Sequence, residues 1–125
     1  MSETRSLRVL IADDEANIVI SLEYLMRKEG YQVATVADGE AALKVAAEFS
    51  PDLVLLDVMM PRKSGYEVCE ALRANPTHAH SRIILLTACG RDSDIERGMA
   101  LGADAYVTKP FSPRELMRKI KTIMT

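Results

Sequence analysis

With 125 residues, the chain is long enough for one domain with a single hydrophobic core. Its 48% hydrophobic and 27% charged residues are ordinary for a globular protein, and they exclude a disordered, collagen-like or coiled-coil chain. The formal net charge of −2 gives no overall attraction to nucleic acid, so we expect no direct nucleic-acid binding.

The first six residues lack the apolar run of a signal peptide. We expect residues 1–6 to be a flexible N-terminal leader and residues 7–125 to form one domain. No later stretch approaches the roughly 18 apolar residues of a membrane span, and two cysteines are too few for a disulfide framework. These features predict a cytoplasmic protein without a membrane segment.

Five short apolar runs along the chain predict β-strands. Several of them are nearly continuous Val, Ile and Leu, which is typical of strands buried on both faces of a parallel sheet. The runs are residues 7–12, 32–36, 53–56, 83–86 and 105–107.

The segments between these runs have the apolar spacing of amphipathic helices. In the second segment, Leu43, Ala46 and Ala47 are expected to face the core. The fourth, around residues 94–101, is weakened by two glycines. The predicted N-terminal caps are Asp38 for the second helix, Ser64 with Glu67 for the third, and Ser112 with Glu115 for the fifth.

Strands that alternate with helices predict an α/β fold with helices on both faces of a parallel sheet. We expect a flavodoxin-like (βα)5 three-layer sandwich with strand order 2-1-3-4-5. Ligands of such sheets bind beyond the carboxyl ends of the strands, close to the reversal of strand order. The first and third strands flank that reversal here.

Five polar residues follow or end the predicted strands: Asp13, Asp14, Asp57, Thr87 and Lys109. The fold brings all of them to one edge of the sheet. Three carboxylates placed together repel one another, and a hard divalent cation with oxygen ligands removes that cost, so Mg²⁺ is the expected occupant. A phosphoryl group transferred to Asp57 would be balanced by the metal, the Lys109 ammonium and the Thr87 hydroxyl.

These residues belong to motifs through which the sequence resembles the receiver domains of two-component response regulators. The resemblance covers essentially the whole chain, and its motifs occur in order at the predicted strand ends. The motifs are Asp13-Asp14-Glu15, Asp57-Val58-Met59-Met60-Pro61, Ser64-Gly65, Leu86-Thr87-Ala88, Gly102-Ala103-Asp104 and Lys109-Pro110-Phe111.

The resemblance implies that Asp57 is the phosphoacceptor and takes its phosphoryl group from a sensor histidine kinase or a phosphotransfer protein. It implies that Mg²⁺, or Mn²⁺ in its place, binds Asp14, Asp57 and the Met59 carbonyl, and that Asp13 acts through water. By this similarity the chain is not an enzyme for other substrates. It would catalyse only its own phosphorylation and dephosphorylation.

The resemblance also implies a conformational switch. Lys109 would contact the phosphoryl group, Thr87 would move toward it, and Tyr106 would turn inward. The Lys109–Pro110 bond is expected to be cis, as in relatives. The surface of the fourth helix, fifth strand and fifth helix would then control a downstream effector or output domain, and a phosphorylation-dependent homodimer is a further expectation.

Met59 and Cys89 occupy positions from which side chains in this family influence the attack of water on the phosphoaspartate. Neither a thioether nor a thiol orients water well. We therefore expect slow self-dephosphorylation.

Other interpretations of the sequence stay open. A receiver-like scaffold that binds a partner without phosphorylation is the main alternative. A Mg²⁺-dependent phosphohydrolase with Asp57 as nucleophile is less favoured, because Met59 stands where haloacid-dehalogenase-like phosphatases place a general acid. A flavin site is disfavoured because the acidic residues after the first strand would repel the FMN phosphate. His78 and His80 are interpreted as parts of a surface loop without a function.

Overall fold

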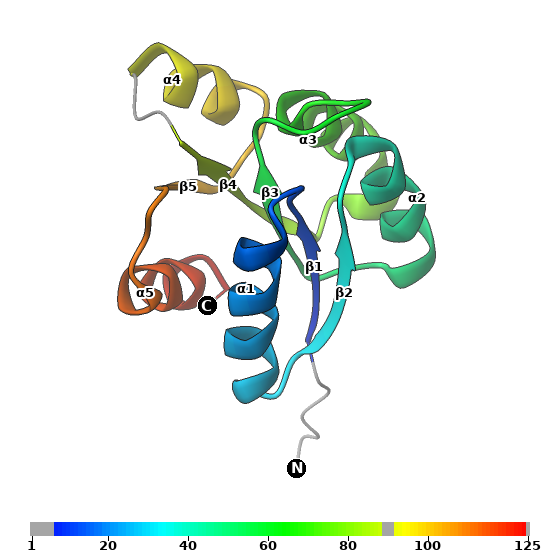
Figure 1. Ribbon diagram of the computed structural model, residues 1–125. Helices are drawn as coiled ribbons and strands as arrows, with labels where there is room; N and C mark the ends of the chain where they lie inside the picture. Colours follow the sequence, from blue (N-terminus) through cyan, green and yellow to red (C-terminus); the bar gives the residue numbers. More distant parts are fainter. Residues whose placement is uncertain (1–6, 89–91, 125) are drawn as a thin grey trace.

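The computed structural model describes residues 7–88 and 92–124, which form a parallel five-stranded sheet between helices (Figure 1). The predicted leader, residues 1–6, and Cys89 lie outside the described residues. The strand order β2-β1-β3-β4-β5 confirms the predicted topology. The strands are β1 (Arg8–Ala12), β2 (Gln32–Val36), β3 (Leu53–Asp57), β4 (Arg82–Thr87) and β5 (Ala105–Thr108).

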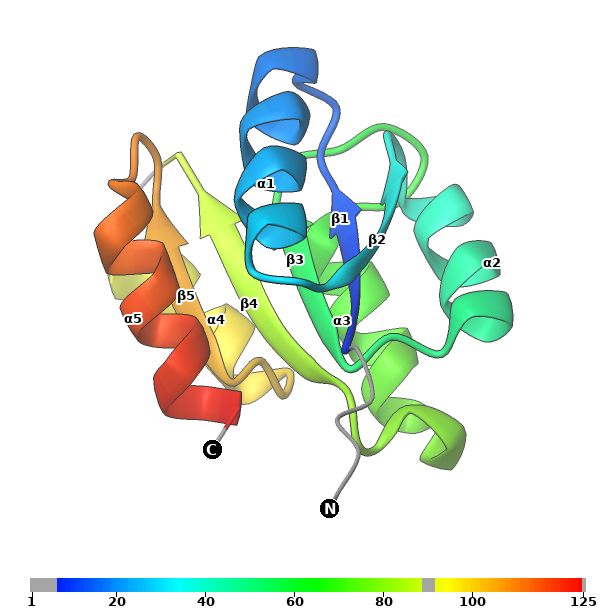
Figure 2. The same cartoon turned by 90° about the horizontal axis from the view of Figure 1, so that it is seen from below.

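Helices cover both faces of the sheet and make the three layers expected of a flavodoxin-like sandwich. Helices α1 and α5 lie on one face, and α2, α3 and α4 lie on the other (Figures 1 and 2). The helices are α1 (Ala16–Lys28), α2 (Gly39–Phe49), α3 (Gly65–Ala74), α4 (Asp92–Ala100) and α5 (Pro113–Met124), with a short 3-10 helix η1 (Pro76–His78) before β4.

The central strands contribute residues to two hydrophobic clusters, one on each face of the sheet. Val9 and Ile11 of β1 belong to the cluster under α1 and α5, whereas Leu10 and Ala12 belong to the cluster under α2 and α3. This division follows from the two-residue period of a strand. Every residue of β3 is buried, as predicted for a strand covered on both faces.

The predicted helix caps are present. The Asp38 side chain accepts a hydrogen bond from the Ala41 amide at 2.8 Å, Ser64 and Glu67 form a capping box, and the Ser112 hydroxyl accepts from the Glu115 amide at 3.0 Å. These bonds satisfy amide groups that the first turn of a helix leaves without an intrahelical partner.

The inward face of α2 was predicted incorrectly at one position. Ala42 and Ala46 are buried, whereas Ala47 is exposed. Residues four apart share one face of a helix, but the residue next to Ala46 is turned by about 100° around the axis. The buried positions of α2 are therefore Gly39, Ala42 and Ala46.

The interpretation of His78 as a surface residue was also wrong, because its side chain is only 4% exposed. Asn75 begins the short 3-10 helix by accepting from the Thr77 amide at 3.0 Å, and this turn directs His78 inward. Its Nδ1 atom has no hydrogen-bond partner among the residues that the structure describes. His80 is exposed, as predicted.

Candidate functional site

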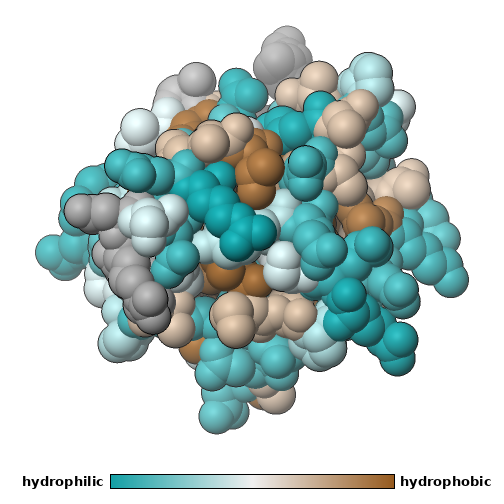
Figure 3. All heavy atoms as spheres, turned by 90° about the horizontal axis from the view of Figure 1, so that it is seen from above, coloured by the Kyte–Doolittle hydropathy of each residue, from teal (hydrophilic) through white to brown (hydrophobic). Residues whose placement is uncertain are grey.

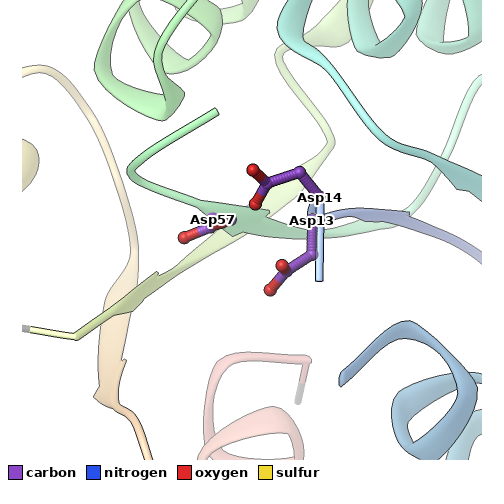
Figure 4. A group of neighbouring side chains, drawn as sticks. All are labelled: Asp13, Asp14 and Asp57. Carbon is purple, nitrogen blue, oxygen red and sulfur yellow. The ribbon is translucent and has the colours of Figure 1, made fainter. Parts of the chain in front are cut away.

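Three carboxylates lie together where β1 and β3 end. These strands are parallel neighbours with Ala12 opposite Leu56, so Asp13 and Asp14 emerge beside Asp57. Figure 4 shows the three side chains gathered at the strand ends. One carboxylate oxygen from each lies within 4.8 Å of the others. The sequence predicted this meeting because carboxyl ends of parallel strands share an edge.

The three carboxylates differ in burial. Asp13 is 1% exposed and Asp57 is 4% exposed, whereas Asp14 is exposed. The carboxyl ends of β1 and β3 point upward in Figure 1, and the molecule seen from above presents mostly hydrophilic side chains with small hydrophobic patches (Figure 3). The site is thus a polar edge with two buried acids and one acid open to solvent.

Lys109 follows β5 and reaches the same group of acids. Its Nζ atom lies 2.9 Å from Oδ2 of Asp13, 3.4 Å from Oδ1 of Asp57 and 2.7 Å from Oε1 of Glu15. The ion pair with Glu15 was not predicted from the sequence. The third acid of the Asp13-Asp14-Glu15 motif was the available signal, since it lies in the same turn. One ammonium among these four acids leaves an excess of negative charge.

The environment of Asp57 disfavours its charged form. The pKa of Asp57 is raised from the ordinary 3.8 to about 7, because burial and then the Asp13 carboxylate raise it more than Lys109 and the Met59 amide lower it. The Met59 amide donates to Oδ1 of Asp57 at 3.3 Å. Without an additional cation, Asp57 is therefore partly protonated near neutral pH.

Lys109 keeps its charge in this setting. Burial by itself would lower the pKa of Lys109, but hydrogen bonds to Glu15 and Asp13 and the charges of Asp57 and Asp13 outweigh burial and raise it. Lys109 is therefore a fixed positive charge next to Asp57.

The structure also describes the other predicted site residues, except Cys89. Thr87 ends β4 and is buried, and Met59 is 73% exposed. Tyr106 is partly buried on β5, where the Lys119 ammonium lies 4.5 Å from its ring centre. The peptide bond between Lys109 and Pro110 is cis. Cys89, the second residue predicted to influence water attack, falls outside the described residues.

An open cavity of about 240 Å³ separates the site from α4. Its wall includes Met59, two residues after Asp57, and Thr87 with Ala88 at the end of β4. The rest of the lining is Val58, Tyr66, Asp94 and Arg97. The neighbourhood of Asp57 is thus continuous with one end of α4.

The acidic cluster suits a hard divalent cation. All its donors are carboxylate oxygens, which Mg²⁺ prefers. The buried Oδ2 atom of Asp13 lies 2.9 Å from the Lys109 ammonium, and the described residues offer it no second donor. Such an atom is available to a cation or to a metal-bound water.

Comparison with known proteins assigns the family. A model described as the response regulator receiver domain matches residues 9–121. The chain belongs to this family. Receiver domains act in two-component signalling and interact with histidine kinases and output domains.

Individual relatives agree with this assignment. The alkaline phosphatase synthesis transcriptional regulatory protein PhoP of Bacillus subtilis is 46% identical over 117 residues, which are 94% of this chain and 48% of that protein. The chemotaxis response regulator CheY4 of Vibrio cholerae has a similar structure, with a TM-score of 0.90 and 30% identity over 95% of this chain and 99% of that one. A structure described as the BeF3-activated DrrB receiver domain is also similar, with a TM-score of 0.86 and 32% identity. The match covers 96% of this chain and 98% of that one.

The chain spans about half the length of the curated relatives it matches. Among the described residues, no helix is long and apolar enough to cross a membrane.

Proposed function

We propose that this receiver domain accepts a phosphoryl group on Asp57 in a Mg²⁺-dependent reaction and changes its surface in response. The observation that carries the proposal is the position of Lys109, whose ammonium lies 3.4 Å from Asp57 within a cluster of three aspartates. An anion attached to Asp57 would meet a fixed positive charge there.

The transfer needs Asp57 in its charged form. A carboxylate oxygen of Asp57 forms the new bond to phosphorus while the donor's bond to phosphorus breaks: P–N in a phosphohistidine, P–O in acetyl phosphate. Asp14, Asp57 and the Met59 carbonyl would hold Mg²⁺ or Mn²⁺, and Asp13 would act through water. The cation supplies positive charge that favours ionised Asp57 and balances the phosphoryl oxygens. Lys109 orients the same oxygens.

The response would pass through Thr87 and Tyr106. Thr87 ends β4 next to the site, and its hydroxyl moves toward the phosphoryl group, after which Tyr106 turns inward. The surface of α4, β5 and α5 then controls an effector, an output domain or a homodimer. Two relatives support a response that controls an output, since DrrB is described as BeF3-activated and PhoP is named a transcriptional regulatory protein.

The phosphoryl donor would be a sensor histidine kinase or a phosphotransfer protein, and the reaction would take place in the cytoplasm. The chain would act on no other substrate and would catalyse only its own phosphorylation and dephosphorylation.

The test is the intact mass after incubation with acetyl phosphate, with and without Mg²⁺. We expect the wild type and the control Glu48→Gln, an exposed acid of α2, to gain one phosphoryl group only with Mg²⁺. Asp57→Asn, which keeps the size of the side chain, should gain none. A gain that persists in Asp57→Asn would mean that another residue accepts the phosphoryl group. No gain by the folded wild type with acetyl phosphate or a kinase would favour the phosphorylation-independent scaffold.

The lifetime of the phosphorylated form is a second expectation at this site. Met59 is exposed beside Asp57 and cannot orient a water molecule, and Cys89 is predicted to share this limitation. We expect Met59→Asn to speed loss of the phosphoryl group about fivefold, the effect of one average hydrogen bond. The control is Met99→Asn, an exposed methionine of α4, and equal lifetimes in both variants would contradict the assigned role.

A further inference from the structure

Helix α4 is attached to the domain differently from the other helices. Within its residues 93–100, Gly98 is the single buried position, and it has no side chain to bury. Each of the other four α-helices places at least two side chains in the core; in α5 these are Leu116 and Ile120. Hydrophobic burial is the main source of helix stability in a domain. The position of α4 must therefore depend more on specific contacts.

The C-terminal end of α4 is tied to α3 by polar contacts. Arg73 donates from Nε to the Gly102 carbonyl and from Nη2 to Oδ2 of Asp104, both at 2.8 Å. The Cys69 thiol lies 3.7 Å from the Leu101 carbonyl. These contacts fix the loop between α4 and β5, so this end of α4 is anchored.

Tyr66 of α3 contacts α4 at Asp94 and Arg97. Tyr66 is 7% exposed, and its hydroxyl donates to the Asp94 carbonyl at 3.2 Å. The Arg97 guanidinium lies over the same ring, 4.2 Å from its centre, a distance typical of a cation–π contact. A Cβ atom at Gly98 would collide with Leu85 of β4, so the absence of a side chain allows this close approach.

The residues of this contact also line the cavity beside the candidate site. Tyr66, Asp94 and Arg97 line the cavity of about 240 Å³ together with Met59 and Thr87. A movement of Thr87 would change the shape of this cavity. Because the other end of α4 is anchored by Arg73, a pivot of the helix about that end would break its contact with Tyr66.

We infer that Tyr66 and Arg97 form a latch, a hydrogen bond and a cation–π contact that hold the N-terminal half of α4 against α3 and oppose the response to phosphorylation. The regulatory part of this inference rests on the proposed function, whereas the latch itself is a property of the unphosphorylated chain. Releasing the latch would allow α4 to move away from α3. A weaker latch should therefore make the domain easier to phosphorylate.

The latch is tested first in the unphosphorylated 125-residue chain, by hydrogen exchange of backbone amides read by mass spectrometry. Tyr66→Phe removes the hydroxyl and keeps the ring, and we expect about fivefold faster exchange in peptides covering α4, the factor expected for one typical hydrogen bond. Arg97→Gln removes a charge from an exposed side chain, so it should fold normally and give a smaller acceleration in the same peptides.

Matched controls separate the latch from general effects. Tyr24→Phe alters an exposed tyrosine of α1, and Lys44→Gln alters an exposed charge of α2; both should exchange like the wild type. Exchange in α4 that stays at the control rate in both latch variants would overturn the inference. Equal acceleration of all peptides in Tyr66→Phe would overturn it too, because Tyr66 would then support the whole core.

The regulatory part has its own readout, the rate of phosphorylation by acetyl phosphate with Mg²⁺. We expect Tyr66→Phe to react several-fold faster than the wild type and than Tyr24→Phe. An unchanged rate, in a wild type that is phosphorylated, would overturn the coupling to the site. A wild type that takes no phosphoryl group would refute the proposed function, while the exchange experiment would still decide whether the latch exists.

Discussion

Asp57 is a buried acid whose surroundings favour its protonated form until a cation or a phosphoryl group arrives. Its pKa of about 7 in the folded chain lies above the ordinary value of 3.8, first because of burial and then because of Asp13. Between these two values the folded state binds more protons than the unfolded state, so stability falls as the pH rises from 3.8 through 7. Asp57 therefore lowers the free energy of unfolding at neutral pH when no metal is bound.

This cost predicts a pH-dependent difference between the wild type and Asp57→Asn. With metal removed by a chelator at pH 8, we expect Asp57→Asn to be more stable by about 1–3 kcal/mol, because the amide is neutral. The difference should shrink as the pH is lowered toward 4. Urea unfolding across this range measures it, and a difference that stays constant with pH would contradict the assigned cause.

At the scale of the elements, Arg73 connects three segments that are distant in the sequence. From α3 it donates to the Ser81 carbonyl before β4, to the Gly102 carbonyl after α4 and to the Asp104 carboxylate before β5. Its side chain and that of Asp104 are 22% and 30% exposed. A partly buried cation with several partners contributes more than an exposed ion pair.

Replacing this arginine should destabilise the domain. We expect Arg73→Met to lower the free energy of unfolding by about 1–3 kcal/mol, since it leaves Asp104 and two carbonyls without this donor. The matched control is Arg27→Met, whose pair with Glu23 lies on the surface of α1 with side chains 56% and 36% exposed. That change should cost less than about 0.5 kcal/mol. Equal losses in denaturant unfolding would argue against Arg73 as a structural link.

The elements also show what a sequence can reveal about this fold. Apolar runs predicted all five strands because a buried strand needs little beyond its own residues to be identified. The inward turn of His78 was missed because it depends on a short 3-10 helix that no apolar pattern marks. The contacts of Tyr66 with Asp94 and Arg97 join residues about 30 positions apart. Only the packing of α3 against α4 creates them.

At the scale of the whole molecule, the candidate site was more predictable than its surroundings, because its residues are positioned by the sheet and its surroundings by side-chain packing. Asp13, Asp14, Asp57 and Lys109 each follow or end a strand, and the parallel order of the sheet brings strand ends together. Topology alone therefore predicts their meeting. The partner Glu15 and the cavity toward α4 depend on side-chain positions, which topology leaves undetermined.

The sheet edge should also link metal binding to the stability of the entire domain. A cation that binds the folded chain and not the unfolded chain stabilises it by about 2.7 kcal/mol at a hundred times its dissociation constant. We expect Mg²⁺ and Mn²⁺ to raise the melting temperature of the wild type. Asp14→Asn, at an exposed position of the cluster, should fold and lose most of this rise, because only two of the three carboxylates remain.

The matched control for that measurement is Glu48→Gln, which removes an exposed acid far from the strand ends and should keep the full rise. Comparable stabilisation of Asp14→Asn and Glu48→Gln would mean that the cation binds elsewhere or screens charge in general. Salt at equal ionic strength separates these two cases, because screening follows ionic strength and a specific site follows the divalent cation. If only Asp14→Asn loses the rise in melting temperature, the cation stabilises the whole domain by binding at the edge where β1 and β3 end.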